Sequence, residues 1–417
     1  MARDPLLTFT PEGIFCPEGG FHIDPWRGVD RAVITHAHSD HARWGSHAYL
    51  CTPLTAPVLR HRLGDVRVEV LAFGTPRRIG GVTLSFHPAG HLPGSAQVRV
   101  ERAGEVWVVS GDYKTGADGL AEGFEPVACH AFISECTFGL PVFRWRPQPE
   151  VMADITAWWA QNRAAARHSV IGAYALGKAQ RLIAGVEPIG PILTHGAVEA
   201  TNAVLRAAGL SLPDTIRVTP ETAMRDHPGA LVVAPPSALA SPWMRRFGPA
   251  STAMASGWMA LRGVRRHRGV QRGFVLSDHA DWEGLNTAIR ATGAERVFVT
   301  HGYTAPFRRW LEEQGFDARV VATEYGGEEE APEGSDPLAE SDAAIRAEEA
   351  GGGAGADGAE DGLAEDGSAE DVQAQDGRTD HGQAGGDPAG PPSANPAEGT
   401  GGGPADAAAP TRRRRRP

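Results

Sequence analysis

The sequence predicts an α/β protein in which a sheet-rich first half is followed by a unit of alternating strands and helices. Two patterns carry this prediction. Short apolar or alternating runs, broken by Gly and Pro, continue to about residue 110, and apolar residues at helical spacing begin near residue 150. A third observation marks the end of the fold: from Glu328 onward there is no Phe, Trp or Tyr. We therefore expect a disordered acidic tail over 328–417.

The expected elements follow one another in a simple order. Strands are expected at 20–24, 31–37, 66–73, 82–87, 96–101, 105–111 and 130–135. A helix is expected at 152–168, after which strands and helices alternate to about residue 268. The last part should contain a strand near 273–277, a turn carrying His279, a helix, a strand ending at His301, a helix at 307–314 and a strand at 320–322.

The net charge of −11 belongs to the tail. Residues 328–417 contain 21 acidic and 7 basic residues, a net of −14, so residues 1–327 carry +3. A mildly basic fold is compatible with a polyanionic substrate. The four cysteines show no C-x-x-C spacing, which argues against a disulfide framework and against a thiolate zinc site. With no signal-peptide pattern and no run of 18 apolar residues, we expect a cytoplasmic protein.

The strongest chemical signal is the sequence His36-Ala37-His38-Ser39-Asp40-His41, directly after the apolar run 32–34. Three imidazoles and a carboxylate in one tight loop can converge on two adjacent metal ions. Zn²⁺ accepts imidazole nitrogen and carboxylate oxygen, and a hydrolytic site also needs an open position for water. The alternative is a His-rich surface turn without a metal.

Further candidate ligands follow later strands. His91, Asp112 and His301 each come directly after an apolar strand. Any one of them alone could be an ordinary turn or capping residue. Together with the His loop, they predict a site for two Zn²⁺ ions, and Mn²⁺ would accept the same ligands.

The order of these motifs, H-x-H-x-D-H, A-G-H-x-x-G-S, S-G-D and a late T-H-G, resembles the metallo-β-lactamase superfamily. Glu135 of ISECTFG, His279 of LSDHAD and His301 of VTHG resemble the three extra motifs of its β-CASP branch, the nucleic-acid-processing nucleases. Segments such as DPWRGVDRAVITHAHSDHA and SPWMRRFG most resemble bacterial ligase-associated DNA exonucleases. The resemblance covers about residues 10–327. It implies a metallo-β-lactamase αββα sandwich at 1–148 and 270–327, with an inserted β-CASP α/β domain at 149–269.

The resemblance also implies roles for individual residues. The implied ligands form two sets bridged by one carboxylate: His36, His38 and His91; Asp40, His41 and His301; and Asp112 between them. Asp24 would orient the His loop without binding metal.

Catalysis would use a metal-activated water, with Asp40 accepting a hydrogen bond from it. His279, oriented by Glu135, would protonate the leaving group or hold a non-bridging oxygen. The alternative is that His279 only caps the helix that begins near Asp281.

The inserted unit offers candidate contacts to a nucleic-acid strand. Lys178 and Arg181 could track phosphates, Ser256 lies in a small-residue turn, and an exposed Trp258 could stack a base. The alternatives are that the charges only form a solvated face and that Trp258 belongs to the core.

The sequence therefore favours a DNA exonuclease acting in repair, with DNA ligase and helicase partners implied by the resemblance. An RNA 3′-end-processing nuclease is the alternative, because the histidine of VTHG is the form found in RNA-processing members of the branch. A small-molecule metallo-hydrolase would share the His loop, although the insertion and the Glu135/His279 pair argue against it. A non-catalytic binding subunit is disfavoured because all seven ligands are present.

Overall fold

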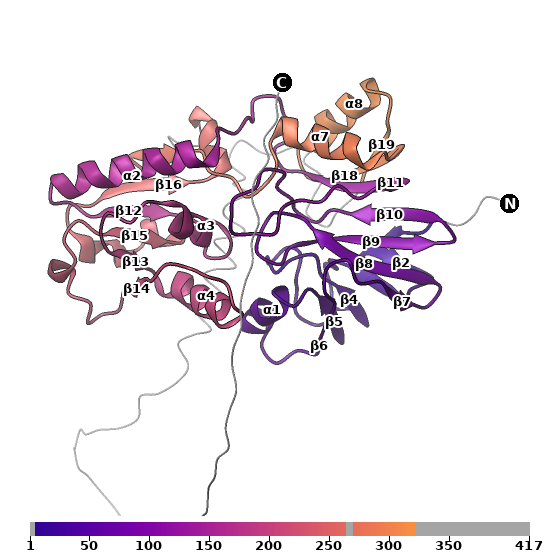
Figure 1. Ribbon diagram of the computed structural model, residues 1–417, viewed down its shortest axis with the longest axis horizontal. Helices are drawn as coiled ribbons and strands as arrows, with labels where there is room; N and C mark the ends of the chain where they lie inside the picture. Colours follow the sequence, from indigo (N-terminus) through magenta and orange to yellow (C-terminus); the bar gives the residue numbers. More distant parts are fainter. Residues whose placement is uncertain (1–4, 264–269, 322–417) are drawn as a thin grey trace, which may run out of the picture. The chain divides into compact units, whose positions relative to one another are not determined.

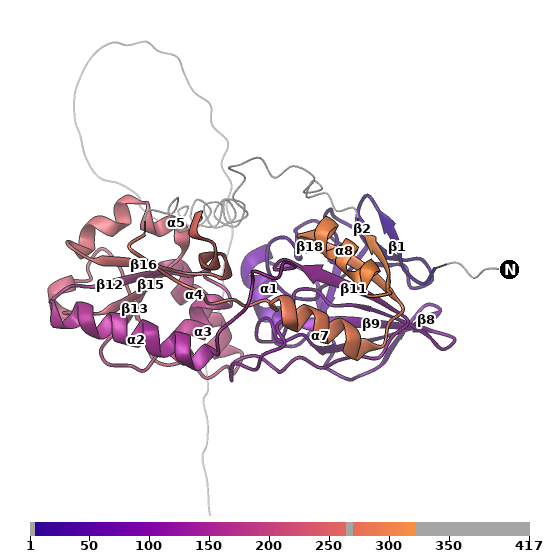
Figure 2. The ribbon, with the colours of Figure 1, turned by 90° about the horizontal axis from the view of Figure 1, so that it is seen from above.

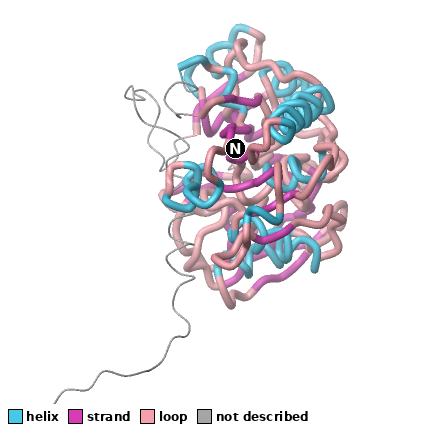
Figure 3. Tube along the Cα trace, turned by 90° about the vertical axis from the view of Figure 1, so that its left-hand side faces the viewer, coloured by secondary structure: helices cyan, strands magenta, loops and turns pink. Residues whose placement is uncertain are grey.

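The computed structural model describes residues 5–263 and 270–321, which form three β-sheets with helices packed on them (Figures 1 and 3). The chain is an α/β protein with mixed sheets. The tail predicted at 328–417 lies outside the described residues. None of the helices within the described ranges is long and apolar enough to cross a membrane.

The first sheet is antiparallel at one edge and parallel at the other. Among the described residues its order is β1 (Thr8–Thr10), β2 (Gly13–Cys16), β3 (Phe21–Ile23), β4 (Arg31–Val33), β5 (Ala48–Cys51) and β6 (Val68–Val70). Strands β3 to β6 run parallel. Helix α1 (Thr55–Leu63) covers the outer face, where its Ala56 and Leu59 pack against Ala32 and Ile34.

The second sheet joins strands from residues 77–136 to strands from residues 296–320. Its order is β19 (Asp317–Val320), β18 (Arg296–Gly302), β11 (Ala131–Cys136), β10 (Glu105–Val109), β9 (Ala96–Arg102), β8 (Val82–Pro88) and β7 (Arg77–Ile79). The first four are parallel and the others antiparallel. Helices α7 (Trp282–Thr292) and α8 (Thr304–Glu313) cover its outer face through residues such as Leu285 and Phe307 (Figure 1).

The two sheets enclose one apolar core. Phe21, Ile23 and Val33 of the first sheet share a buried cluster with Val98 and Trp107 of the second. Successive side chains of a strand point to opposite faces of its sheet, so each sheet has one face for this core and one for its helices. The resulting order of layers is helix, sheet, sheet, helix.

The third sheet is wholly parallel. Within the described part of the chain its order is β14 (Ile216–Arg217), β13 (Ile192–Thr194), β15 (Leu231–Ala234), β12 (Ser169–Gly172), β16 (Ser251–Ala255) and β17 (Arg272–Phe274). Figure 2 shows α2 (Gln148–Ala164) and α3 (Lys178–Gly185) on one side and α5 (Pro236–Leu239) on the other. Its three central strands β13, β15 and β12 are buried at every position because helices cover both faces, as in other parallel sheets.

The chain enters the third sheet after β11 and returns before β18, the neighbour of β11 in the second sheet. Helix α4 (Gly196–Ala207) packs on α1 through Leu205 and Val58. The segment that holds the third sheet therefore contacts the first sheet's helix as well as the ends of the second sheet.

Some predicted bounds were wrong. The strand expected at 320–322 is β19 and ends at Val320, and the strand expected at 66–73 is only the three-residue β6. The helix expected at 152–168 begins and ends about four residues earlier, as α2. The elements that were not predicted include helix α1 and strands β1, β2, β5, β7, β13 and β16.

Candidate metal centre

The His-rich loop begins where β4 ends, and Asp24 holds both of its ends. The backbone N–H and the hydroxyl of Thr35 donate to the two carboxylate oxygens of Asp24, at 2.8 and 2.5 Å. His41 Nδ1 lies 2.7 Å from Asp24 Oδ2. Because a carboxylate only accepts, Nδ1 carries a proton, and Nε2 on the other side of the ring faces Asp40 and Asp112. Asp24 thus orients the loop by holding Thr35 and His41.

Three imidazole nitrogens converge at the first cluster. His36 Nε2 and His91 Nε2 each lie 3.1 Å from His38 Nδ1. Asp112 Oδ2 lies 3.5 Å from His36 Nε2 and 3.8 Å from His91 Nε2. The four side chains are wholly or largely buried and offer ligand atoms that all lie within 4.8 Å of one another.

In each of these three rings, one nitrogen faces the other ligands and is called the inner nitrogen. The other, the outer nitrogen, already has a hydrogen-bond acceptor. His36 Nδ1 lies 3.1 Å from the Thr35 hydroxyl, which itself donates to Asp24. His38 Nε2 lies 3.2 Å from the carbonyl oxygen of Leu176, and His91 Nδ1 lies 3.0 Å from that of Asp278. If the outer nitrogens carry the protons, the inner ones present lone pairs to each other. Three such lone pairs about 3 Å apart repel unless a cation lies between them.

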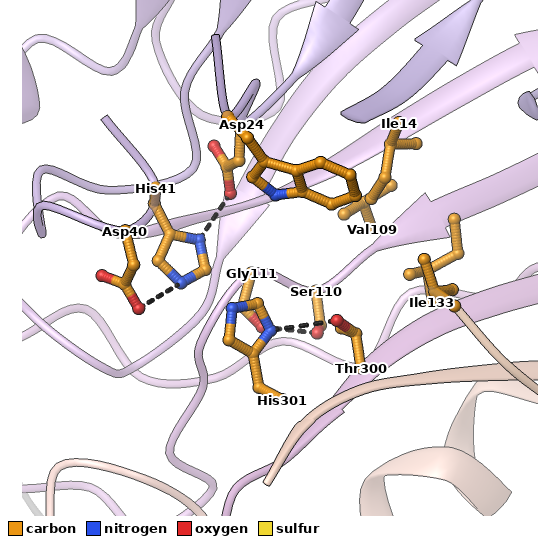
Figure 4. Close-up of a pocket in the computed structure, with 12 residues that line it drawn as sticks. Ile14, Asp24, Asp40, His41, Val109, Ser110, Gly111, Ile133, Thr300 and His301 are labelled. Carbon is orange, nitrogen blue, oxygen red and sulfur yellow. Dashed lines mark hydrogen bonds and ion pairs between the residues drawn. The ribbon is translucent and has the colours of Figure 1, made fainter. Parts of the chain in front are cut away.

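The second cluster consists of Asp40, His41 and His301 (Figure 4). His41 Nε2 lies 3.6 Å from Asp40 Oδ2 and 3.4 Å from Asp112 Oδ1. The rings of His41 and His301 stack with centroids 5.0 Å apart. A cavity of about 30 Å³ runs beside them, with Ile14, Val109 and Ile133 at its apolar end.

Asp112 lies between the two clusters, with Oδ2 facing the first and Oδ1 the second. It follows Gly111, whose φ is +55°. A Cβ at that glycine would come within 2.6 Å of the Thr35 side chain, so only glycine lets this strand end approach the His loop so closely. His301 has a φ of +54°, which is strained for a non-glycine residue. Both strand ends are shaped to bring side chains to the centre.

These residues fit divalent metal ions. Within the described residues, the buried atoms His41 Nε2 and Asp112 Oδ1 have no hydrogen-bond partner. Zn–N bonds of about 2.0–2.1 Å in a tetrahedral site place ligand nitrogens about 3.3 Å apart, close to the 3.1 Å observed in the first cluster. The groups could therefore hold metal, and their chemistry does not distinguish Zn²⁺ from Mn²⁺.

The electrostatics agree with metal binding. Burial, reinforced by neighbouring imidazoles, lowers the pKa of His36 and of His91 well below 6.5, so both are neutral near pH 7. Burial alone would raise the pKa of Asp112, but the charges of His41 and His279 hold it well below its usual value. Burial likewise opposes protonation of His41, yet the carboxylates around it raise its pKa well above 6.5. The carboxylates near His41 therefore favour a positive charge at the centre, such as a bound cation.

A histidine–carboxylate pair lies beside the first cluster. His279 Nδ1 is 2.9 and 3.0 Å from the two oxygens of Glu135, which is fully buried and also accepts from the backbone N–H of Tyr113. Burial opposes protonation of His279, but Glu135 and Asp112 raise its pKa above 6.5. The ring lies 4.6 Å from that of His91.

The cap of α7 is Asp281, which accepts from the N–H of Gly284 at 2.8 Å. His279 therefore does not have the capping role that the sequence left open.

Lys178 and Arg181 lie differently from residues that track a strand. Both are buried. Lys178 Nζ pairs with Asp278 Oδ2 at 2.6 Å, and Arg181 pairs with Asp118 at 2.7 Å and with Asp278 at 3.2 Å. Arg181 also donates to the carbonyl oxygen of His91 at 2.8 Å. This placement favours a role in positioning His91 and the segment before His279 over contact with phosphates.

Ser256 is buried and its hydroxyl accepts from the N–H of Trp258, so it caps the short helix η3 (Gly257–Ala260). Trp258 is partly exposed and packs on Phe138, with ring centroids 4.9 Å apart. Trp258 is thus neither fully buried in a core nor isolated on the surface.

The sequence reasoning missed several residues at this site. Asp118 and Asp278 supply the buried counter-charges, and the carbonyl oxygen of Leu176 holds His38. Only the position of Asp278 directly before His279 could have drawn attention to it, because these contacts join residues about 100 positions apart.

Comparison with known proteins gives two curated relatives. No family model matches the chain. A protein of Opitutus terrae named "Probable DNA ligase" is 32% identical over 315 residues, which cover 74% of this chain and 30% of that protein. "Ribonuclease TTHA0252" of Thermus thermophilus is 30% identical over 149 residues, which cover 28% of this chain and 34% of that protein. The chain thus spans about a third of the length of each relative.

A solved structure shares the fold. It is a protein of unknown function from Enterococcus faecalis V583, with a TM-score of 0.50 and 11% sequence identity. The match covers 71% of this chain and 80% of the other. At this identity the likeness concerns the fold alone.

Proposed function

We propose that the chain is a metal-dependent nuclease of the β-CASP branch of the metallo-β-lactamase superfamily, acting as a DNA exonuclease in repair together with a DNA ligase. One observation carries the proposal. The two oxygens of Asp112 face two separate ligand clusters, and the Glu135–His279 pair adjoins the first of them. A site for two metals beside a histidine that can carry a proton suits phosphodiester hydrolysis.

The proposed domains follow the sheets except at one boundary, because β17 (Arg272–Phe274) belongs to the third sheet but lies beyond residue 269. Residues 1–148 and 270–327 would form the metallo-β-lactamase domain from the first two sheets, and residues 149–269 the inserted β-CASP domain. The support is that the third sheet is entered after β11 and left before β18, two adjacent strands. Both ends of an insertion are then accommodated without breaking the second sheet.

The proposed ligands are those that the sequence suggested: His36, His38 and His91 for one ion, Asp40, His41 and His301 for the other, and Asp112 for both. Two bound Zn²⁺ or Mn²⁺ ions would supply a nucleophilic hydroxide near neutral pH and neutralise charge developing on the phosphoryl group. Asp40 has a partly exposed carboxylate at the edge of the second cluster, where it can accept a hydrogen bond from the attacking water.

His279 is proposed as the proton donor to the leaving oxygen. Its Nδ1 is held by Glu135, so Nε2 carries the transferable proton when the ring is charged. Glu135 is fully buried and cannot move away to solvent, which fixes the direction of the imidazole. The side chain of His279 is 20% exposed, enough for a substrate to reach it.

The choice of DNA rests on the longer of the two matches, the one with a protein named for DNA ligation. An exonuclease that trims ends would prepare substrates for such a partner, and a helicase would supply unwound strands. A nuclease that processes RNA ends is the second candidate, favoured by the relative named as a ribonuclease.

The test is an assay of the full chain with end-labelled single- and double-stranded DNA and RNA of matched sequence, with and without added Zn²⁺ or Mn²⁺. His279→Ala should lower kcat about 10²- to 10⁴-fold with little change in KM, the range typical of a lost general acid. His61→Ala is the matched control, since His61 is an exposed histidine on α1.

Metal-dependent laddering of DNA, abolished in His279→Ala but not in His61→Ala, is the expected result, and the labelled end gives the polarity. Laddering of RNA alone would move the protein to RNA processing. Two bound metals with no cleavage of any strand would overturn the nuclease proposal and favour a small-molecule hydrolase.

A further inference from the structure

Five aromatic rings gather beside His279, and we call them the aromatic cluster: Phe138, Phe143, Trp145, Trp258 and Tyr303. Phe138 lies at its centre, with ring centroids 4.8 Å from Phe143 and Trp145 and 4.9 Å from Trp258. Tyr303 completes the cluster, 5.8 Å from Phe143 and 6.3 Å from Trp258. The rings come from three separate segments of the chain.

The cluster has a buried layer and a partly exposed layer. Phe138 and Phe143 are 2% and 0% exposed. Trp145, Trp258 and Tyr303 are each partly exposed. Indole and phenol rings that stand on buried phenylalanines, with one side apolar and one side reaching water, are typical of binding surfaces.

The cluster contacts the proposed reaction centre directly. The ring of Phe138 lies 5.8 Å from that of His279, and Trp145 Nε1 donates to the carbonyl oxygen of His279 at 2.9 Å. Tyr303 follows His301 by two residues. The cluster therefore adjoins both the proposed proton donor and a proposed ligand of the second ion.

The position of Trp258 is fixed by its backbone. The hydroxyl of Ser256 accepts from the N–H of Trp258, and the N–H of Ser256 donates to the carbonyl oxygen of Phe274. A Cβ at Gly257 would lie 2.5 Å from the ring of Phe138, so only glycine allows this close approach. A ring held in place before binding loses little conformational entropy when a partner stacks on it.

We propose that the aromatic cluster stacks the unpaired nucleobase of a nucleotide next to the scissile phosphodiester. This inference rests on the proposed nuclease function and adds the state of the substrate: the base beside the cleaved bond must be unpaired to reach the rings. Stacking tolerates any base because every base has a π-face, so the enzyme should act on strand ends with little sequence preference.

The experiment measures binding of the full chain, loaded with metal, to a fluorescein-labelled single-stranded DNA whose phosphorothioate linkages resist hydrolysis. Each of the three terminal nucleotides is replaced in turn by an abasic one. The variants are Trp258→Ala, Trp258→Phe and the matched control Trp243→Ala. Trp243 also follows a capping serine by two residues and packs on Phe247, within the third-sheet segment.

The expected result is a loss of affinity of about tenfold when one particular base is removed, within the range known for a stacked base. Trp258→Ala should lower the affinity for the intact strand by a similar factor. It should not lower the affinity for the strand that lacks this base any further. Trp258→Phe should recover most of the affinity, and Trp243→Ala should behave like the wild type.

Two results would overturn the inference: wild-type affinity that is indifferent to every abasic position, or an equal loss by Trp258→Ala on intact and abasic strands. Cleavage is measured separately on ordinary DNA and RNA. Base-dependent binding without cleavage would overturn the nuclease proposal alone, and cleavage with base-independent binding would overturn the stacking site alone.

Discussion

The buried charges around Asp278 allow a quantitative prediction. Asp278 pairs with Lys178 at 2.6 Å and with Arg181 at 3.2 Å, and the three side chains are 3%, 4% and 1% exposed. Asp278→Asn keeps the volume but removes the charge. Arg181 retains Asp118, whereas no other ion pair of Lys178 is found in the described structure. Removing one partner of a buried pair costs about 3–5 kcal/mol, and we expect a loss of unfolding free energy in that range.

The sign of the pH dependence follows from the pKa of Asp278. Burial opposes its ionisation, but Lys178 and Arg181 hold the pKa well below the usual value. A depressed pKa in the folded state contributes stability above the unfolded value of about 3.9, and this contribution is lost as the pH falls below it. At pH 7 the ionised Asp278 therefore makes its full contribution to the unfolding free energy.

The assay is urea unfolding of the metal-free chain at pH 7, followed by tryptophan fluorescence. Asp317→Asn is the control, because its ion pair with Arg319 is about half exposed and should contribute less than about 1 kcal/mol. Adding Lys178→Met to Asp278→Asn should recover part of the loss, since the ammonium is then no longer buried without a partner. A loss below about 1 kcal/mol for Asp278→Asn would refute the reasoning.

Three further predictions concern the site. Asp112→Asn should reduce the metal content from about two ions per chain to one or none, because it removes the carboxylate that faces both clusters. Elemental analysis after dialysis measures the metal content. An unchanged metal content would exclude a bridging role for Asp112. Glu135→Gln should lower kcat about 10²-fold and move the basic limb of the pH–rate profile to lower pH. The reason is that Glu135 raises the pKa of His279, whose charged form is the proposed proton donor. A basic limb that does not move would exclude His279 as the acid. Asp281→Ala should cost about 1 kcal/mol in urea unfolding by removing the cap of α7, and no change would contradict that cap.

The sequence predicts the His loop well because its chemistry is local. Four side chains with ligand atoms lie within six residues, and the strand before them is apolar. His91, Asp112 and His301 could be anticipated because each follows an apolar strand, and strand ends meet at one edge of a sheet. The two clusters that these residues form are among the groups of described residues that could hold a metal ion, and Asp112, Glu135 and His279 form another such group.

Burial of charge could not be predicted in the same way. Lys178 and Arg181 lie in a helix whose sequence suits a solvated face, and their burial depends on Asp278, about 100 positions later. The aromatic cluster is a similar case, because its rings come from segments that sequence spacing does not connect.

The missed elements have ordinary physical reasons. Strand β16 reads STAMA, which contains residues with low strand propensity, and it forms a strand because β12 and β17 flank it. Helix α1 has only a weak separation of apolar and polar faces, so its periodicity gives little signal. Strand β13 has three residues, too short for a pattern to be recognised.

The connection of the third sheet between β11 and β18 also sets the order in which the centre is completed during synthesis. His36, His38, His91 and Asp112 all leave the ribosome before the third sheet is made, whereas His279 and His301 follow it. Glu135 is made early, but its partner His279 follows 144 residues later. A nascent chain would therefore form the first ligand cluster early, whereas the second cluster and the Glu135–His279 pair form only when the whole fold is finished. On the proposed function, an unfinished chain would not cut nucleic acid.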